Sequence, residues 1–221
     1  MHGYGAAGVT AQIEALALAD WRRRIHELYA DIRRESDPAR AWLAWRAVRE
    51  RMFREHPQSP IAATERAGFA GLPHYDYDPT WRLQASLVPL QTTTEISDEI
   101  GADGSIRLRP VARTRGLEER LGRELTLYWI EGYGGGLFLP FRDATAGSET
   151  YGGGRYLYDS IKGADLGTQP DGRLVLDFNF AYHPSCCYSA EWVCPLAPPE
   201  NQVPAAIRAG ERLALAGASA N

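Results

Sequence analysis

The chain has 221 residues, 44% of them hydrophobic, and a formal net charge of −4. We expect one domain over residues 1–221, with enough apolar side chains for a core. The mildly acidic charge argues against a nucleic-acid surface, and no apolar run approaches the roughly 18 residues that cross a bilayer. Neither nucleic acid nor a membrane is therefore expected as a partner.

The N-terminal part of the chain predicts helices. Residues 10–34 carry apolar residues at spacings of four, three and four from Trp21 to Ile32, which gives one apolar face. Asp37 and Pro38 form a helix start signal, because the carboxylate can cap free amides and proline fits the first helical position. A second helix follows, and it ends at the next proline.

A short third helix and a change of pattern come next. The third helix is expected to end near Gly68 or Gly71, which gives a helical region over residues 10–68. Beyond Pro73 apolar residues alternate with polar ones, and this period of two predicts strands. The expected strands, some of them joined by turns such as Asp103-Gly104, cover residues 81–87, 91–97, 106–111, 125–129, 137–139, 155–161 and 173–180.

Six to eight strands with short, turn-rich links favour a mainly antiparallel sheet. We expect this sheet to form a β-barrel or sandwich over residues 73–213, with the helices across one opening or edge. The predicted fold class is α+β.

Three cysteines lie close together at Cys186, Cys187 and Cys194. Because the cysteine number is odd and no secretory signal precedes them, we expect reduced thiols and a cytoplasmic protein. Zinc accepts cysteine and histidine ligands, and His183 lies nearby. The spacing is not that of two CxxC pairs, so a metal at Cys186 and Cys194 is only weakly indicated, and a buried cysteine commonly acts as a small apolar residue.

Two segments, residues 139–159 and 177–211, concentrate polar side chains among glycines and prolines. Their glycine-rich stretches lack the Gly-Lys-Ser/Thr element of a phosphate-binding loop. Adjacent residues on a strand point to opposite faces, so Arg142 and Asp143 are expected to diverge. The polar residues of these segments either form an internal ion-pair network or line a pocket.

The same segments carry a family resemblance. PFRDATAGSETYGGGRYL and DFNFAYHPSCCYSAEWVCPLAPPENQVPAAIRAGE are similar to two motifs of the bacterial and archaeal family called domain of unknown function 1684. The resemblance implies no established activity or cofactor. His183 and Cys187 depart from the family pattern, which weakens an essential role for either. Motif positions of the family are occupied here by Arg142, Asp143, Thr145, Tyr151, Arg155, Asp177, Asn179, Tyr182, Cys186, Cys194, Glu200 and Asn201.

Two hypotheses follow for these residues. In the first, the chain is a small-molecule-binding barrel, with or without catalysis by an acidic residue such as Asp177, Glu200 or Asp143. In the second, it is a structural or interaction domain whose polar residues fix the fold. The ligand-binding or polar-network candidates are Arg142, Asp143, Thr145, Tyr151, Arg155, Asp177, Asn179, Tyr182, Glu200 and Asn201.

Two minor alternatives remain, the cysteine-based metal site and an FMN-binding barrel in which Arg142 and Arg155 meet a phosphate. The substrate, the cofactor and the oligomeric state stay open. We predict that the two segments meet in space, because buried charges need partners. By residue type, Asp177 and Glu200 are the expected partners of the two arginines.

Overall fold

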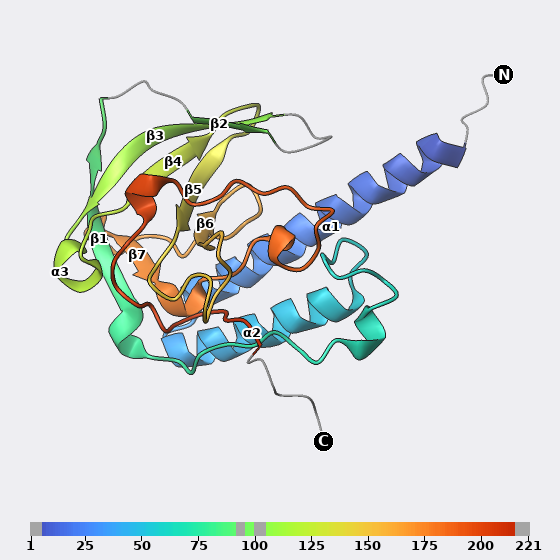
Figure 1. The fold of residues 1–221 in the computed structure, drawn as a ribbon, viewed down its shortest axis with the longest axis horizontal. Helices are drawn as coiled ribbons and strands as arrows, with labels where there is room; N and C mark the ends of the chain where they lie inside the picture. Colours follow the sequence, from blue (N-terminus) through green and yellow to red (C-terminus); the bar gives the residue numbers. More distant parts are fainter. Residues whose placement is uncertain (1–5, 92–95, 100–104, 215–221) are drawn as a thin grey trace.

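The molecule consists of a helix pair that packs against a strongly curved antiparallel sheet (Figure 1). The computed structural model describes residues 6–91, 96–99 and 105–214. Within these ranges, no helix has an apolar stretch long enough to cross a membrane. The α+β class is confirmed, with N-terminal helices followed by an antiparallel, nearly closed barrel.

The two long helices run antiparallel to each other (Figure 1). Helix α1 spans Ala6–Arg34 and helix α2 spans Pro38–Glu55. The Asp37 carboxylate accepts hydrogen bonds from the amides of Ala39 and Arg40 at 3.0 and 3.3 Å, so it caps α2 as predicted. Both helices therefore begin and end close to where the apolar periodicity and the start signals indicated.

The expected third helix is only a 3-10 turn, Arg66–Gly68. The chain beyond it packs beside α2, where Phe69 stacks on Phe53 with ring centroids 6.4 Å apart. Gly71 then has a φ of +115°, which a side chain would strain. The aromatic contact and this glycine turn the chain back along α2.

Seven strands form the described sheet, in the order β6-β5-β4-β3-β1-β7, and β2 pairs with β3 off this path. Every pairing is antiparallel. The strands are β1 Arg82–Pro89, β2 Ile96–Glu99, β3 Ser105–Arg115, β4 Thr126–Ile130, β5 Gly136–Phe141, β6 Arg155–Asp159 and β7 Leu174–Asp177.

Two details of the β-rich part differ from the prediction, and two expected features lie partly or wholly outside the described residues. A short helix, α3 (Glu118–Leu121), lies between β3 and β4. Strand β7 is shorter than expected, because the Asp177 carboxylate accepts the Asn179 amide and turns the chain into a 3-10 helix, Phe178–Phe180. Part of the strand expected at 91–97 and the turn expected at Asp103-Gly104 lie outside the described residues.

The barrel is nearly closed between its two edge strands. The loop after β6 fills the space, because the Val175 amide of β7 bonds to the Gly167 carbonyl at 3.0 Å and the Asp159 amide of β6 bonds to the Ala164 carbonyl at 3.0 Å. The Tyr158 hydroxyl of β6 donates to the Val175 carbonyl at 2.6 Å. This loop therefore joins the edges without a direct strand pairing.

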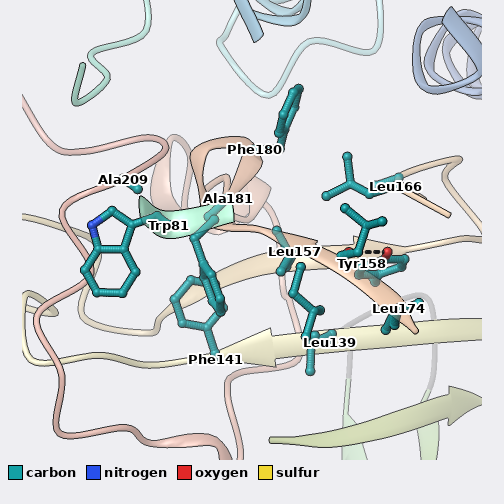
Figure 2. Packing of buried hydrophobic residues seen from close by; sticks show 14 of the residues in the cluster. Trp81, Leu139, Phe141, Leu157, Tyr158, Leu166, Leu174, Phe180, Ala181 and Ala209 are labelled. Atoms are coloured by element: carbon teal, nitrogen blue, oxygen red, sulfur yellow. Dashed lines mark hydrogen bonds between the residues drawn. The ribbon is translucent and has the colours of Figure 1, made fainter. Parts of the chain in front are cut away.

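One hydrophobic cluster contains residues of the helices and of the barrel. Leu139, Phe141 and Leu157 point into the barrel interior (Figure 2), and Phe178 meets Phe141 edge to face at 5.1 Å. Trp45 of α2 is fully buried and contacts Phe180 with centroids 5.4 Å apart. The interior of the barrel is therefore filled by side chains.

Candidate functional site

The two polar segments lie side by side, as predicted. The Arg142 amide donates to the Asn201 carbonyl at 3.0 Å, and the Val203 amide donates back to the Arg142 carbonyl at 2.8 Å. Two residues on, the Ala144 amide bonds to the Ala205 carbonyl at 3.0 Å. The segment after β5 thus runs beside the C-terminal segment.

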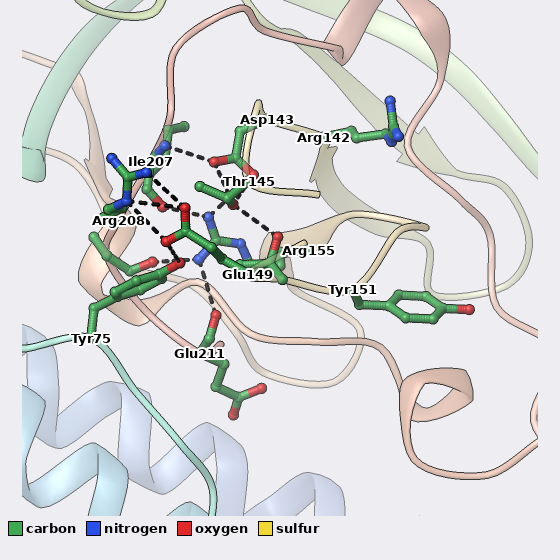
Figure 3. A network of polar contacts seen from close by, with 12 residues as sticks. Tyr75, Arg142, Asp143, Thr145, Glu149, Tyr151, Arg155, Ile207, Arg208 and Glu211 are labelled. Carbon is green, nitrogen blue, oxygen red and sulfur yellow. Dashed lines mark hydrogen bonds and ion pairs between the residues drawn. The ribbon is translucent and has the colours of Figure 1, made fainter. Parts of the chain in front are cut away.

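Three candidates converge on one buried network (Figure 3). The Thr145 hydroxyl lies 2.9 and 3.0 Å from the two Asp143 carboxylate oxygens, and the Ile207 amide donates to one of them at 2.7 Å. Arg155 lies 3.4 Å from Asp143 and donates to the carbonyls of Ile207, Ala209 and Glu211. The network therefore ties β6 to the C-terminal segment.

The predicted partners of Arg155 were wrong. Its side chain is fully buried, and its ion pair is with Asp143 rather than with Asp177 or Glu200. Burial lowers the pKa of this guanidinium, and the Asp143 carboxylate opposes the effect. Because this guanidinium is fully buried and donates to three protein carbonyls, it is not exposed to a phosphate, and Arg155 no longer supports the FMN alternative.

Asp177 and Asn179 form a separate pair at the end of β7. The Asn179 side chain donates to Asp177 and to the Asp78 carbonyl, both at 2.8 Å, and its oxygen accepts the Asp78 amide at 2.9 Å. Arg82 of β1 lies 3.2 Å from Asp177. Burial raises the pKa of Asp177, against the hydrogen bonds from Asn179 and the charge of Arg82.

Glu200 and Asn201 anchor the C-terminal segment to the barrel. The fully buried Asn201 side chain accepts the Thr126 amide at 2.7 Å and donates to the carbonyls of Thr126 and Pro140, both at 2.8 Å. Asn201 thereby bridges β4 and β5. Glu200 is exposed and accepts a hydrogen bond from the Tyr128 hydroxyl, so it is not the partner of an arginine.

The remaining candidates do not join the network. Arg142 and Tyr151 point away from it (Figure 3), and the Arg142 guanidinium donates to the Gly152 carbonyl at 2.9 Å. Arg142 and Asp143 therefore diverge, as the alternation of faces predicts. A hydrogen bond with Cys186 and burial raise the pKa of Tyr151 to about 12. Tyr182 lies under α2, with the Arg49 guanidinium 4.7 Å above its ring.

A second buried network centres on Glu211, which the sequence reasoning did not select. One carboxylate oxygen accepts two hydrogen bonds from Arg49 of α2, at 2.6 and 2.9 Å. The other accepts the His183 amide at 2.7 Å and the Tyr188 hydroxyl at 2.9 Å. Burial alone would raise the pKa of Glu211, but the Arg49 charge, aided by His74 and His183, holds it below its usual value.

A signal for this pair exists in the sequence. Arg49 falls four residues after Trp45 and three before Met52, on the apolar face of the predicted helix. A charge inside an apolar stripe must find an opposite charge when the stripe is buried. Glu211 ends the second motif segment and is the matching carboxylate.

His183 is a structural contact rather than a free base or ligand. Its ring Nε2 accepts the Tyr151 amide at 3.2 Å, which links the two motif segments. Burial lowers the pKa of His183 to about 4, so the ring is neutral at pH 7. Among the described residues, no group of three or more potential ligands has the arrangement of a metal site, and all three cysteines are free thiols.

A small cavity of about 60 Å³ lies between the helix pair and β6. Of the candidate residues only Tyr182 lines it, together with residues that the sequence reasoning did not select. Tyr29 of α1 lines the cavity, and its buried hydroxyl has no hydrogen-bond partner among the described residues. The other lining residues are Trp21, Ile25, Arg49, Phe53, Pro60, Tyr156, Lys162, Ala164, His183, Pro184 and Ser185.

The chain is similar to a family model and to a solved structure. The model of a family described as "Protein of unknown function (DUF1684)" matches residues 67–212, which include both polar segments. A solution NMR structure of an uncharacterized protein of Haloarcula marismortui is 36% identical, covers 78% of this chain and 92% of its own, and superposes with a TM-score of 0.54. No curated protein matches the chain.

Proposed function

The chain belongs to the DUF1684 family, whose description names no activity, and we propose from the geometry that it binds a small polar molecule in the cavity between α1, α2 and β6. The observation that carries the proposal is that Tyr29, which lines the cavity, has a buried hydroxyl without a partner among the described residues. An unpaired buried hydroxyl costs about 1–3 kcal/mol. A ligand oxygen would remove that cost.

The size of the cavity limits the ligand. Its volume of about 60 Å³ holds roughly four waters at about 15 Å³ each, far below the 300 Å³ or so of a drug-sized site. We therefore expect a small molecule, or the polar end of a larger one.

Charge and protonation narrow the chemistry further. Burial raises the pKa of Tyr29, so its hydroxyl stays protonated and can donate. The cations of the wall already have partners, because Arg49 pairs with Glu211 and Lys162 with Asp159 at 3.3 Å. A neutral ligand with an acceptor oxygen, such as an alcohol, an amide or a protonated acid, fits this environment best.

In this proposal Tyr182 is the one motif candidate that contacts the ligand, and the other motif residues position the walls. The second hypothesis, a structural or interaction domain, is favoured by the same network, because Asp143, Arg155, Asn179 and Asn201 bond to other parts of the chain. The two proposals differ only in whether the cavity takes up a ligand.

A matched pair of tyrosine variants tests the proposal. Tyr29→Phe removes the unpartnered hydroxyl, and Tyr158→Phe removes one that donates to the Val175 carbonyl at 2.6 Å. Thermal unfolding is measured with and without a panel of small alcohols, amides and carboxylic acids. Without ligand, Tyr29→Phe is expected to keep or raise stability, and Tyr158→Phe to lose about 1 kcal/mol.

With a stabilising compound, Tyr29→Phe is expected to weaken binding about tenfold, because one hydrogen bond is lost. Tyr158→Phe should leave the affinity unchanged. If no compound of the panel stabilises the wild-type chain more than the Tyr29→Phe chain, the cavity is not a binding site and the structural hypothesis is favoured.

A further inference from the structure

Two of the three thiols are in contact in the loop that follows the barrel. Cys186 lies in a 3-10 turn, Ser185–Cys187, and its amide donates to the Cys194 sulfur at 3.4 Å. Both cysteines are half-buried. Trp192 and Val193, which precede Cys194, are 38% and 51% exposed, so the chain that carries this sulfur is open to solvent.

The surroundings of Cys194 favour its thiolate. A hydrogen bond from the Cys186 thiol is the main cause, and the amides of Cys186 and Ser185 and the Lys162 ammonium act in the same direction against burial. These groups lower the pKa of Cys194 to about 6. The shared hydrogen bond raises the pKa of Cys186, which therefore holds the proton of the pair at neutral pH.

The neighbouring Cys187 provides an internal comparison. Burial, followed by the charge of Glu211, raises its pKa to about 12. It shares the turn with Cys186 but has neither the thiol partner nor the ammonium. Activation in this loop is thus specific to one sulfur.

The thiol pair lies beside the cavity. Ser185 and Lys162, which favour the Cys194 thiolate, are both in the cavity lining. On the other side, the Tyr156 hydroxyl, also in the lining, donates to the Pro195 carbonyl next to Cys194. The loop is held against the cavity rim on both sides of the thiols.

We propose that Cys194 and Cys186 form a thiol–disulfide exchange site, in which Cys194 is the attacking thiolate and Cys186 the resolving thiol, and which oxidises the pair at the expense of a low-molecular-weight disulfide. The site uses the loop and does not rest on ligand binding inside the cavity. Exchange through a mixed disulfide requires an accessible thiolate and a second thiol within reach.

The reaction balances in two steps. The Cys194 thiolate attacks one sulfur of the small disulfide, forms a mixed disulfide and releases one small thiolate. The Cys186 thiol then gives up its proton to that thiolate and attacks the Cys194 sulfur, which releases the second small thiolate. Two electrons pass from the protein thiols to the small disulfide, and the products are a Cys186–Cys194 disulfide and two reduced fragments.

Alkylation of the unmodified chain is the first test. Iodoacetamide is applied at a series of pH values, and the rate at each cysteine is read by peptide mass spectrometry. At pH 7 the thiolate fraction of Cys194 exceeds that of Cys187 by a factor of about 10⁵. A thiolate of low pKa is a weaker nucleophile, which reduces the difference in alkylation rate by roughly 10²–10³. We expect Cys194 to react on the order of 100-fold faster, with a midpoint near pH 6.

Oxidised glutathione and three alanine variants are the second test. The wild-type chain and the control Cys187→Ala are expected to lose two hydrogen atoms in intact mass. Cys186→Ala removes the main cause of the low Cys194 pKa, so its glutathione adduct on Cys194 should form more slowly than the wild-type chain reacts. The adduct should then persist, because the resolving thiol is gone. Cys194→Ala should form neither the internal disulfide nor a glutathione adduct at a comparable rate.

Circular dichroism confirms that each variant is folded, and the alkylation test needs no variant. Equal alkylation rates at Cys194 and Cys187 would overturn the proposal. So would a folded Cys186→Ala chain that forms no glutathione adduct, or a wild-type chain whose adduct persists without resolution.

Discussion

The buried ion pair between Arg49 and Glu211 gives the sharpest test of how the helices and the C-terminal segment hold together. We choose Arg49→Met, which keeps an unbranched apolar stem beside Trp45 and Tyr182 but removes the guanidinium. Glu211 is 1% exposed and loses two hydrogen bonds, at 2.6 and 2.9 Å, and its only ion pair with an arginine in the described structure.

The expected loss is large because one charge stays buried. Removing one partner of a buried ion pair costs about 3–5 kcal/mol, since the remaining ion has no compensating charge. For a chain of this size 1 kcal/mol shifts Tm by about 2–4 °C. We therefore expect Tm to fall by roughly 6–20 °C.

The variant should also reverse part of the pH dependence. In the wild-type chain the folded pKa of Glu211 lies below the ordinary value of 4.5, so its contribution to stability is present above that pH and is lost on acidification. Without Arg49, burial dominates and the folded pKa rises above 4.5. The variant then loses stability as the pH rises, and the difference from the wild type is larger at pH 8 than at pH 5.

Urea unfolding at pH 5 and pH 8, followed by circular dichroism, measures both effects. Arg40→Met is the matched control on the same helix, because Arg40 is 67% exposed and pairs with a surface Glu35. It should cost less than about 1 kcal/mol. If Arg49→Met costs no more than this control, or loses equal stability at the two pH values, the reasoning is refuted.

Three further predictions concern other buried contacts. Gly210→Ala is expected to lower the free energy of unfolding by about 3 kcal/mol or more, because φ is +80° and a Cβ would lie 2.4 Å from a backbone carbonyl oxygen. The control Gly172→Ala has a similar φ of +84° but open space around it, so it should lose only about 1 kcal/mol in urea unfolding. Asn201→Ala removes three hydrogen bonds to backbone groups and should cost about 3 kcal/mol; a loss below about 1 kcal/mol in the same assay would contradict its bridging role. Burial lowers the pKa of His74 and His183 from 6.5 to about 4. The free energy of unfolding should therefore fall as the pH falls from about 6.5 towards 4. If NMR shows that both rings titrate near pH 6.5, this prediction is wrong.

The fold was largely predictable because its signals are local. The apolar stripe of α1 and the alternation in β1 are each contained within one element, so periodicity alone locates them. The short helix α3 was missed because four residues are too few to show a period. The end of β7 was missed because a side chain, Asp177, turns the backbone, and period-two patterning does not register such a cap.

The polar partners were harder to predict because pairing depends on the three-dimensional path. Residue type made Asp177 and Glu200 reasonable partners for Arg155, yet the closer carboxylate was Asp143, twelve residues earlier and brought into line by the bend after β5. Arg49 and Glu211 are 162 residues apart. No sequence proximity links them, and they pair because both are buried. The sequence indicates the burial of Arg49 alone, because this charge lies within the apolar face of α2.

The positions of the two networks also bear on where chemistry can take place in this molecule. His183 fixes one end of the cysteine loop to the first motif segment, and Asn201 fixes the other end to the barrel. Between these anchors the chain is irregular and partly exposed, and it carries Cys186 and Cys194. A new covalent bond between these thiols changes a loop that is already tethered at both ends, so the buried ion pairs need not break. Tyr188 lies between the two thiols and donates to Glu211, so the thiol pair and one buried network share this loop. Oxidation should leave the unfolding of the barrel nearly unchanged as long as this hydrogen bond is kept.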